Sequence, residues 1–538
     1  MPPIAPEETP PPAAKPPRIG ALTPLKLPVF RMLWSTWLAA NICMWMSDVA
    51  SAWLMTTLTT TPIWVALVQS ASTLPVFLLG LPSGALADIL DRRRWLVATQ
   101  FWLAGTAIVL CAAIVMEVMT APLLLALTFA NGIGLALRWP VFAAIVPELV
   151  PRPQLPAALG LNGIAMNASR IIGPLLAGAL IASAGSVWVF GLNAVLSVAS
   201  GFVILRWRRE TKPNPLGREK LVGAMRVGVQ FVRQSARMRA VMVRISIFFL
   251  HSTALLALLP LLARQLQGGD AGTFTLLLAA MGSGAIVAVL FMPRLRQAFG
   301  RDQLVIRGAL LQSAATAVMA IAPNAWVAVP AMFFGGMAWI TVANSLSVSA
   351  QLALPDWVRA RGMSMFQMAI MGASAFGAAL WGHIATVSSL QTSLLVAAVS
   401  GSLAMAVALR YVLDGTADDD LSPARAGWAE TPMHQEPGEG RVVITVEYLI
   451  DPARAAAFHL VMQQTRRTRL SEGAIGWELL HDLAEPARYV EQIVDPSWTD
   501  HLRRFHRATA ADLALRERRL AFHVGQEAPV VTRYVVQR

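Results

Sequence analysis

The chain is dominated by long apolar segments separated by short polar ones. A helix needs about 20 mostly apolar residues to cross the hydrocarbon core of a bilayer, and we identify twelve segments of that kind. One such segment alone would equally fit a buried core helix, but twelve in one chain predict an all-α, multi-pass protein embedded in a lipid bilayer. They occupy residues 33–57, 62–86, 95–116, 122–145, 156–182, 187–206, 240–263, 273–292, 303–321, 325–350, 362–385 and 390–412.

The composition excludes an ordinary cytosolic enzyme over most of the length. Only 14% of the residues are charged, whereas soluble domains average about 25%. The formal net charge of +13 would suit a nucleic-acid partner, but the arginines lie between the apolar segments, where membrane topology requires them. We therefore expect no nucleic-acid partner.

The arginines also predict the orientation of the chain. If the N-terminus is cytoplasmic, the outer loops contain only Arg264, and all the other loop arginines are inside. Cytoplasmic loops carry an excess of Lys and Arg, so we expect both termini in the cytoplasm and the protein in the cytoplasmic membrane. The inner arginines are Arg92, Arg93, Arg94, Arg152, the cluster within 206–239, Arg294, Arg296, Arg301, Arg359 and Arg361.

The segments divide into two related halves. A basic connection at 207–239 separates a six-helix bundle at 29–206 from a second one at 240–413, and residues 1–28 form a proline-rich cytoplasmic tail. Pro147 and Pro355 end corresponding segments of the two halves, and each is followed by an acid and a basic turn. Paired bundles around a central path suit transport by alternating access.

The loop between the second and third segments carries a recognisable pattern. Residues 84–94 read GALADILDRRR, which resembles the signature loop of the major facilitator superfamily. A glycine allows close helix contact, and Asp88 at a helix end can pair with arginines or with a helix N-terminus. The resemblance implies a latch that holds one transport state shut; a basic loop that only sets topology is the alternative. The loop residues are Gly84, Asp88, Asp91, Arg92, Arg93 and Arg94.

Other patterns resemble one branch of that superfamily, the transmembrane secretion effectors, which include enterobactin exporters and macrolide efflux proteins. The resemblance is carried by Asp48 and by residues 139–140, 145–151, 170–174, 293–295 and 300–302. Gly173, Pro174 and Gly178 are similar to a fifth-span motif of exporters, with Ala177 in place of a usual glycine. The resemblance implies proton-coupled export of a small molecule such as a drug or siderophore. A lipid or lysolipid transporter of the same fold is an alternative.

Four ionisable residues lie within apolar segments, where they usually face a cavity or a partner. Asp48 and Arg170 are each about 20 Å along an outward-running helix, at 1.5 Å per residue. We predict that they pair, either to couple protonation of Asp48 to export or as a static ion pair. Arg138 would attract an anionic substrate or reach the headgroups. His251, on the same helix face as Arg244, would bind substrate or protons, or serve only in packing.

Further polar residues are open to two interpretations. They line the transport path or connect helices by hydrogen bonds; they are Asn41, Gln69, Asn131, Asn167, Asn344 and Gln367. Cys43 and Cys111 lie in apolar segments, without the spacing of a metal site or a disulfide framework. The sequence therefore predicts neither a metal nor a cofactor.

The last hundred residues have the composition of a soluble domain. Residues 414–440 form an acidic linker, and 441–538 predict strands at 441–450, 474–480, 488–494 and 530–536, with helices at 452–470 and 496–523. This βαββαβ order predicts a ferredoxin-like module. It resembles antibiotic-biosynthesis-monooxygenase domains, which implies dimerisation and a pocket near Trp498, His501 and His506. We expect a dimerisation or regulatory module rather than an enzyme; a substrate-modifying domain is the alternative.

Overall fold

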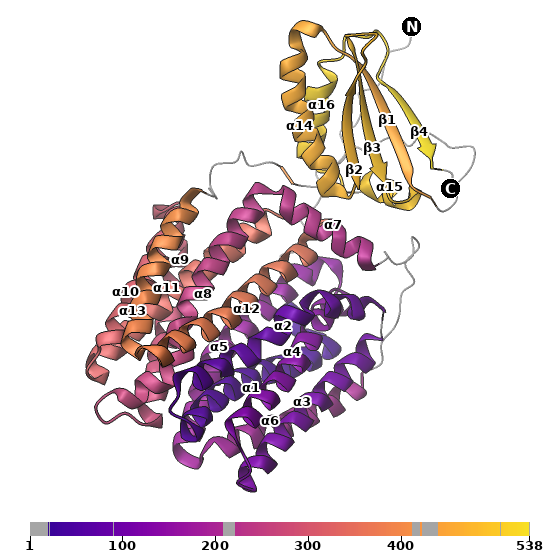
Figure 1. The fold of residues 1–538 in the computed structure, drawn as a ribbon. Coiled ribbons are helices and arrows are strands. Elements are labelled where there is room, and N and C mark those ends of the chain that lie inside the picture. The colour runs from indigo at the N-terminus through magenta and orange to yellow at the C-terminus, as the bar shows by residue number, and fades with distance from the viewer. Residues whose placement is uncertain are drawn as a thin grey trace, which may run out of the picture.

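A computed structural model describes residues 20, 22–89, 91–207, 221–410, 420–421, 440–505 and 507–536. The chain forms a large bundle of long helices, with a smaller domain containing a β-sheet against one end of it (Figure 1). The first half of the bundle contains α1 (Pro28–Leu58), α2 (Pro62–Ile89), α3 (Arg92–Val115), α4 (Ala121–Leu149), α5 (Leu155–Ala184) and α6 (Ser186–Leu205).

The second half of the bundle repeats this arrangement. It contains α8 (Ala236–Gln265), α9 (Ala271–Ala298), α10 (Arg301–Ile321), α11 (Ala325–Leu352), α12 (Asp356–Val387) and α13 (Leu390–Val407). In the described part of the chain, 11 helices are long and apolar enough to cross a membrane. Helix α1 has 31 residues but is not among them, because Asn41 and Asp48 lower its mean hydropathy.

Short polar side chains determine where many of these helices begin. Asp91 accepts a hydrogen bond from the backbone N–H of Arg94 at the start of α3, and Ser235 caps α8 in the same way. Asp270 and Thr273 form a reciprocal capping box at α9. These side chains satisfy backbone N–H groups that have no partner within the helix.

Two pairs of helices supply most of the contact between the two halves. At Gly80 and Gly382, α2 packs against α12: a Cβ on Gly80 would lie 2.7 Å from Met368 Cγ, and a Cβ on Gly382 would lie 2.5 Å from Ala66 Cβ. At Gly178, α5 meets α9, where a Cβ would lie 2.2 Å from Thr275 Oγ1. Glycine at these positions lets helices from opposite halves approach more closely than any other residue would.

The connection between the halves contains a helix that the sequence analysis missed. Helix α7 (Leu221–Gln234) lies in the segment we had treated only as a basic linker. Its apolar residues gather on one side, and Phe231 meets the ring of Trp357 on α12 edge to face at 5.8 Å. Gln230 donates a hydrogen bond to the backbone oxygen of Ala474 in the C-terminal domain, so α7 connects that domain to the bundle.

The C-terminal domain is built on a four-stranded antiparallel sheet. Its strands are β1 (Val442–Leu449), β2 (Gly476–His481), β3 (Arg488–Asp495) and β4 (Val530–Val535), in the spatial order β2-β3-β1-β4. Helices α14 (Ala455–Glu472), α15 (Trp498–Phe505) and α16 (Ala510–Leu520) accompany the sheet (Figure 1). Each strand predicted from the sequence is confirmed to within two residues. The helix predicted at 496–523 is divided into α15 and α16, and Thr509 caps the second of these.

Candidate substrate and coupling site

Asp48 lies in the middle of the bundle, where the two halves meet. It lines a cavity of about 20 Å³ together with Gln69 and Ser72 of α2 and Ala257 of α8. In the described part of the chain, its carboxylate has no hydrogen bond and no ion pair. A carboxylate at this depth is costly when charged and unpaired, so this position suits a group that takes up and releases a proton.

The predicted pair between Asp48 and Arg170 is not formed. Instead, the Arg170 guanidinium lies between two indoles, 5.3 Å from the ring centroid of Trp45 on α1 and 4.5 Å from that of Trp339 on α11. Its Nε has no hydrogen-bond acceptor among the described residues. Because α5 and α11 belong to different halves, Arg170 connects the two halves through cation–π contacts rather than through an acid.

The relative height of two helices explains this error. The starts of α1 and α5 share one apolar cluster, so the helices run in the same direction, and Gly173 lies directly against Trp45. Arg170 precedes Gly173, whereas Asp48 follows Trp45, which separates them by about 9 Å along the axes at 1.5 Å per residue. The prediction measures the depth of Asp48 and Arg170 from the starts of their helices, but α1 and α5 do not start at the same depth.

Arg138 is also buried without an acid. Its side chain is 2% exposed and lies 5.2 Å over the ring of Trp37, which in turn stacks on Phe142 at 3.9 Å. Its Nε and Nη2 atoms have no acceptor in the described structure. This burial contradicts an arginine that reaches the headgroups, and it leaves a cation available to an anionic group.

Arg244 and His251 on α8 face elements of the second half. Arg244 forms an ion pair with Asp302 on α10, and Nδ1 of His251 contacts the backbone oxygen of Ile247 at 2.7 Å. His251 lies 5.6 Å from the ring of Trp381 and lines a cavity of about 20 Å³ with Gln312. The structure therefore places His251 within the second half, away from the cavity beside Asp48.

The signature loop connects the ends of three helices. Arg92 at the start of α3 pairs with Glu148 at the end of α4 at 2.6 Å, and Arg93 donates to the backbone oxygen of Leu205 at the end of α6. Asp91 caps α3. The side chain of Asp88 and the environment of Gly84 lie outside the described residues, so the predicted latch stays a prediction.

The fifth-span motif has a clear packing role. Gly173 accommodates Trp45, and Gly178 accommodates Thr275 of α9, while Pro174 lies inside α5. One motif thus sets the contact of α5 with α1 and with the other half of the bundle. Gly178, like Arg170, lies at a boundary that must rearrange if the halves move.

The other polar candidates are dispersed. Asn41 is fully buried and donates to the backbone oxygen of Trp37 at 2.7 Å, whereas Asn344 accepts a hydrogen bond from Arg296 at 3.4 Å. Gln69 lies beside Asp48, and the side chain of Asn167 is not described. The sequence analysis missed Trp45 and Trp339 as partners of Arg170, since tryptophans in apolar segments carry no signal that separates packing from cation binding.

The C-terminal domain contains a fully enclosed charge network. Glu491 on β3 is 0% exposed and accepts hydrogen bonds from Arg469 Nε at 3.1 Å, Trp477 Nε1 at 3.0 Å and Tyr448 Oη at 3.0 Å. Burial opposes ionisation of Glu491, but Arg469 and Arg519 outweigh it and lower its pKa to about 2. The carboxylate is thus charged and satisfied, which indicates a structural role.

Nearby, His501 on α15 contacts Asp495 through Nδ1 at 2.8 Å, and the rings of Trp498 and His501 lie 5.0 Å apart. Burial lowers the pKa of His501, although Asp495 opposes that shift. His506, the third residue predicted here, lies outside the described residues. Among the described residues no group of histidine, cysteine and acidic side chains has the geometry of a metal site.

Solved structures of transporters share this fold. A POT family transporter in complex with 5-aminolevulinic acid superposes with a TM-score of 0.58 at 12% identity, over 71% of this chain and 96% of that one. This likeness shows the fold of the bundle. The model of the transmembrane secretion effector family matches residues 19–538, and the chain belongs to that family. With its apolar helices, the chain is thus a multi-pass membrane transporter of the major facilitator type.

Two curated relatives are siderophore transporters. The chain is 21% identical over 258 residues to the staphyloferrin A transporter of Staphylococcus aureus, which covers 48% of this chain and 64% of that protein, less than two thirds of its length. It is 26% identical over 325 residues to the enterobactin exporter of Salmonella typhimurium, covering 59% of this chain and 75% of the relative. The family and these relatives indicate transport of small molecules.

Proposed function

We propose that the protein exports a small molecule from the cytoplasm in exchange for protons, and that Asp48 is the proton-binding group. The observation that carries this proposal is the carboxylate of Asp48, which has no partner among the described residues and lies in a small cavity between α1, α2 and α8. Because α8 belongs to the other half of the bundle, movement of the halves changes the surroundings of Asp48. A carboxylate that alternates between a closed and a hydrated environment alternates between protonated and ionised forms.

The substrate of this proposed cycle carries an anionic group. Arg138, which is buried, and Arg170, which is half-buried, have no acid partner among the described residues. Arg170 also contacts both halves through Trp45 and Trp339. The affinity for an anion bound at Arg170 would therefore depend on how the two halves are placed relative to each other. The relatives named for staphyloferrin A and enterobactin support a siderophore or a similar metabolite as the cargo.

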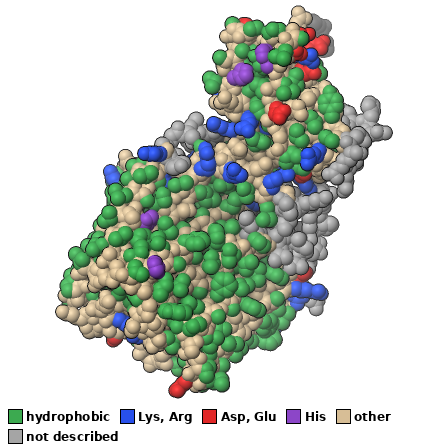
Figure 2. All heavy atoms as spheres, viewed as in Figure 1, with side chains coloured by type: hydrophobic (Ala, Val, Ile, Leu, Met, Phe, Trp, Pro, Cys, Tyr) green, Lys and Arg blue, Asp and Glu red, His purple; other side chains and the backbone are tan. Residues whose placement is uncertain are grey.

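The proposal includes twelve membrane spans. The twelfth is α1, whose polar residues lower its hydropathy below that of the other 11 candidate spans. It places the protein in the cytoplasmic membrane with both termini in the cytoplasm. Lys and Arg side chains gather where the bundle meets the C-terminal domain (Figure 2), which supports a cytoplasmic location for that end because cytoplasmic loops are rich in these residues.

For the C-terminal domain we propose a ferredoxin-like module that regulates or pairs subunits and performs no catalysis. The order β2-β3-β1-β4 and the helices between strands support this fold. Strand β4 is at the edge of the sheet and exposes Val530, Val531 and Tyr534, so a second copy of the domain would cover apolar surface there.

Efflux into inverted membrane vesicles tests the proposal. Energised vesicles would be given staphyloferrin A, enterobactin and a macrolide, and accumulation would be followed with and without a protonophore. We expect at least one compound to accumulate, the protonophore to abolish accumulation, and Asp48→Asn to do the same. Glu117→Gln also replaces an acid by its amide, but at an exposed loop position, and this variant should transport normally. Protonophore-sensitive accumulation that persists in Asp48→Asn would refute Asp48 as the coupling group.

A further inference from the structure

A third cavity, larger than those beside Asp48 and His251, lies where the C-terminal domain meets the bundle. Its volume is about 490 Å³, within the range of pockets that bind small molecules. The domain contributes walls from α14 and α16, and the bundle contributes walls from α7, α8 and α12. Phe231, Trp357 and Leu515 supply apolar surface on opposite sides, so the cavity exists only while the domain is docked.

The charges around this cavity are mostly positive. Arg237, Arg467 and Arg507 line it, and the acids that line it are Glu472 and Asp512. Asp512 accepts hydrogen bonds from the backbone N–H and the hydroxyl of Thr509 at 2.8 and 2.7 Å, which stabilise its ionised form. Planar guanidinium groups are well suited to binding carboxylates.

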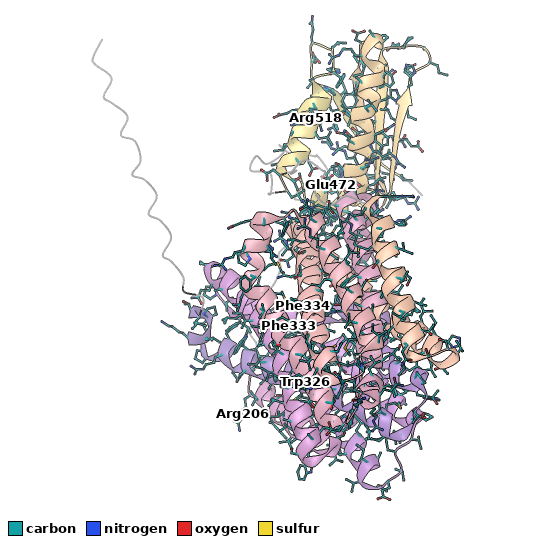
Figure 3. All side chains as sticks on the ribbon, turned by 90° about the vertical axis from the view of Figure 1, so that its left-hand side faces the viewer. Arg206, Trp326, Phe333, Phe334, Glu472 and Arg518 are labelled. Carbon is teal, nitrogen blue, oxygen red and sulfur yellow. The ribbon has the colours of Figure 1, made fainter. Side chains whose placement is uncertain are left out.

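Glu472 gives the clearest indication that a ligand belongs there. It is the last residue of α14, is 5% exposed and lies where the domain faces the bundle (Figure 3). Its carboxyl group has no hydrogen-bond partner in the described part of the chain, at a helix end whose dipole disfavours negative charge. Because Glu472 also lines the cavity, a molecule bound there can supply the hydrogen-bond partner that its carboxyl group lacks.

The protonation state of Glu472 follows from its neighbours. Burial, Asp512 and Asp495 raise its pKa, Arg469 and Arg504 oppose the shift, and the balance of these effects places the pKa at about 8. At neutral pH the carboxyl group is therefore mainly neutral and presents an O–H donor to the cavity. Among the arginines that line the cavity, Arg507 already donates to the backbone oxygen of Glu472 and lies 5.0 Å over the ring of Trp357, so it helps to hold the wall of the cavity.

We propose that this cavity is a binding site for a small anionic molecule that carries a carboxylate and a flat apolar group. The carboxylate binds Arg467 and Arg237, the O–H of Glu472 donates to an oxygen of the ligand, and the flat group lies against the Trp357 side of the cavity. A bound ligand touches both the domain and the bundle, so it stabilises the docked arrangement. The site is separate from Asp48 and does not depend on the proposed proton coupling.

Binding of radiolabelled salicylate to the full chain in lipid nanodiscs tests this site, with empty nanodiscs as background. Arg467 and Arg466 are both exposed residues of α14, but only Arg467 lines the cavity. We expect saturable binding that Arg467→Ala weakens by about tenfold, the value of a charge-assisted hydrogen bond. Arg466→Ala should bind as the wild type does, and benzylamine should not compete.

A second variant separates the role of Glu472 from that of charge alone. Glu472→Gln keeps a neutral donor, so it should bind salicylate at pH 7 as the wild type does. The wild type should lose affinity between pH 7 and pH 9 as Glu472 ionises, and Glu472→Gln should lose less. The proposal is overturned if salicylate shows no saturable binding, if benzylamine competes, or if Arg466→Ala and Arg467→Ala weaken binding equally.

Discussion

Buried charges have opposite surroundings in the membrane bundle and in the C-terminal domain. In the domain, Glu491 is fully enclosed and accepts hydrogen bonds from Arg469, Trp477 and Tyr448. In the bundle, Asp48 has no partner among the described residues and Arg170 has only aromatic neighbours. Glu491 is fully buried, whereas Asp48 and Arg170 are half-buried within a bundle of apolar helices; an unpaired charge is expensive in either environment.

The contrast shows how to separate structural from functional charges. A buried group whose partners are all present is held in one protonation state, and it contributes to folding. A buried group that lacks a partner is held by the surrounding fold at a cost, and a substrate or proton can lower that cost. Strain of this kind is concentrated at functional sites, which is why we propose a role in transport for Asp48 and Arg170 and a role in stability for Glu491.

The largest expected effect is on the domain. Glu491→Gln leaves Arg469 and Arg519 buried without their acid, and removing one partner from a buried ion pair costs about 3–5 kcal/mol. Hydrogen exchange of the β3 amides in the full chain measures this cost. Glu447→Gln, which removes an exposed partner of Arg488, should cost at most about 1 kcal/mol. Equal effects of the two changes would show that the network around Glu491 is not structural.

In the bundle, Arg170→Lys keeps the charge but loses the planar face that stacks on Trp45 and Trp339. We expect transport to fall by about tenfold, because a cation–π contact out of water contributes about 1–2 kcal/mol. Arg264→Lys is the matched control, since Arg264 lies 5.0 Å over Trp53 but is exposed. Vesicle transport rates that are unchanged in Arg170→Lys would remove Arg170 from the substrate path.

The pH dependence of the domain should follow Glu491. Its pKa in the folded protein is about 2, below the ordinary value of 4.5, so its contribution is complete above pH 4.5 and is lost as the pH falls towards 2. Hydrogen exchange of β3 between pH 6 and pH 3 should show progressive loss of protection. In Glu491→Gln this acid dependence should be smaller; an identical dependence would assign it to other acids.

The smallest effect is expected in the signature loop. The pair of Arg92 and Glu148 is partly exposed, with side chains 18% and 33% accessible, and such pairs contribute at most about 1 kcal/mol after solvent screening. Thermal unfolding of Arg92→Ala should therefore differ little from that of the wild type. A loss of more than about 2 kcal/mol would mean that the loop holds the helices together far more strongly than this contact implies.

The long helices of the bundle and the four strands of the domain could be predicted because their signals are local. Apolar length identifies most of the long helices, and alternation identifies the four strands of the domain. Helix α7 was missed because its 14 residues are too short and too basic for a membrane span. The segment at 207–239 was therefore interpreted only as a linker.

The site was harder to predict because it depends on how helices are placed relative to one another. Asp48 and Arg170 were correctly singled out as charges in apolar segments, yet their pairing was wrong. The contact of Gly173 with Trp45 sets how far α5 is shifted along its axis relative to α1. Counting residues along a single helix does not give this shift. Trp339 lies in the other half of the bundle, so its contact with Arg170 is equally invisible in a local pattern.

The most direct test of the central claim is to count the protons that purified protein releases when substrate binds. In weakly buffered detergent solution, a saturating compound identified by the vesicle assay would be added, and the pH change recorded with an indicator dye. If Asp48 exchanges its proton for substrate, the wild type and Glu117→Gln release close to one proton per bound molecule, and Asp48→Asn binds substrate without release. Equal release by wild type and Asp48→Asn would contradict the account.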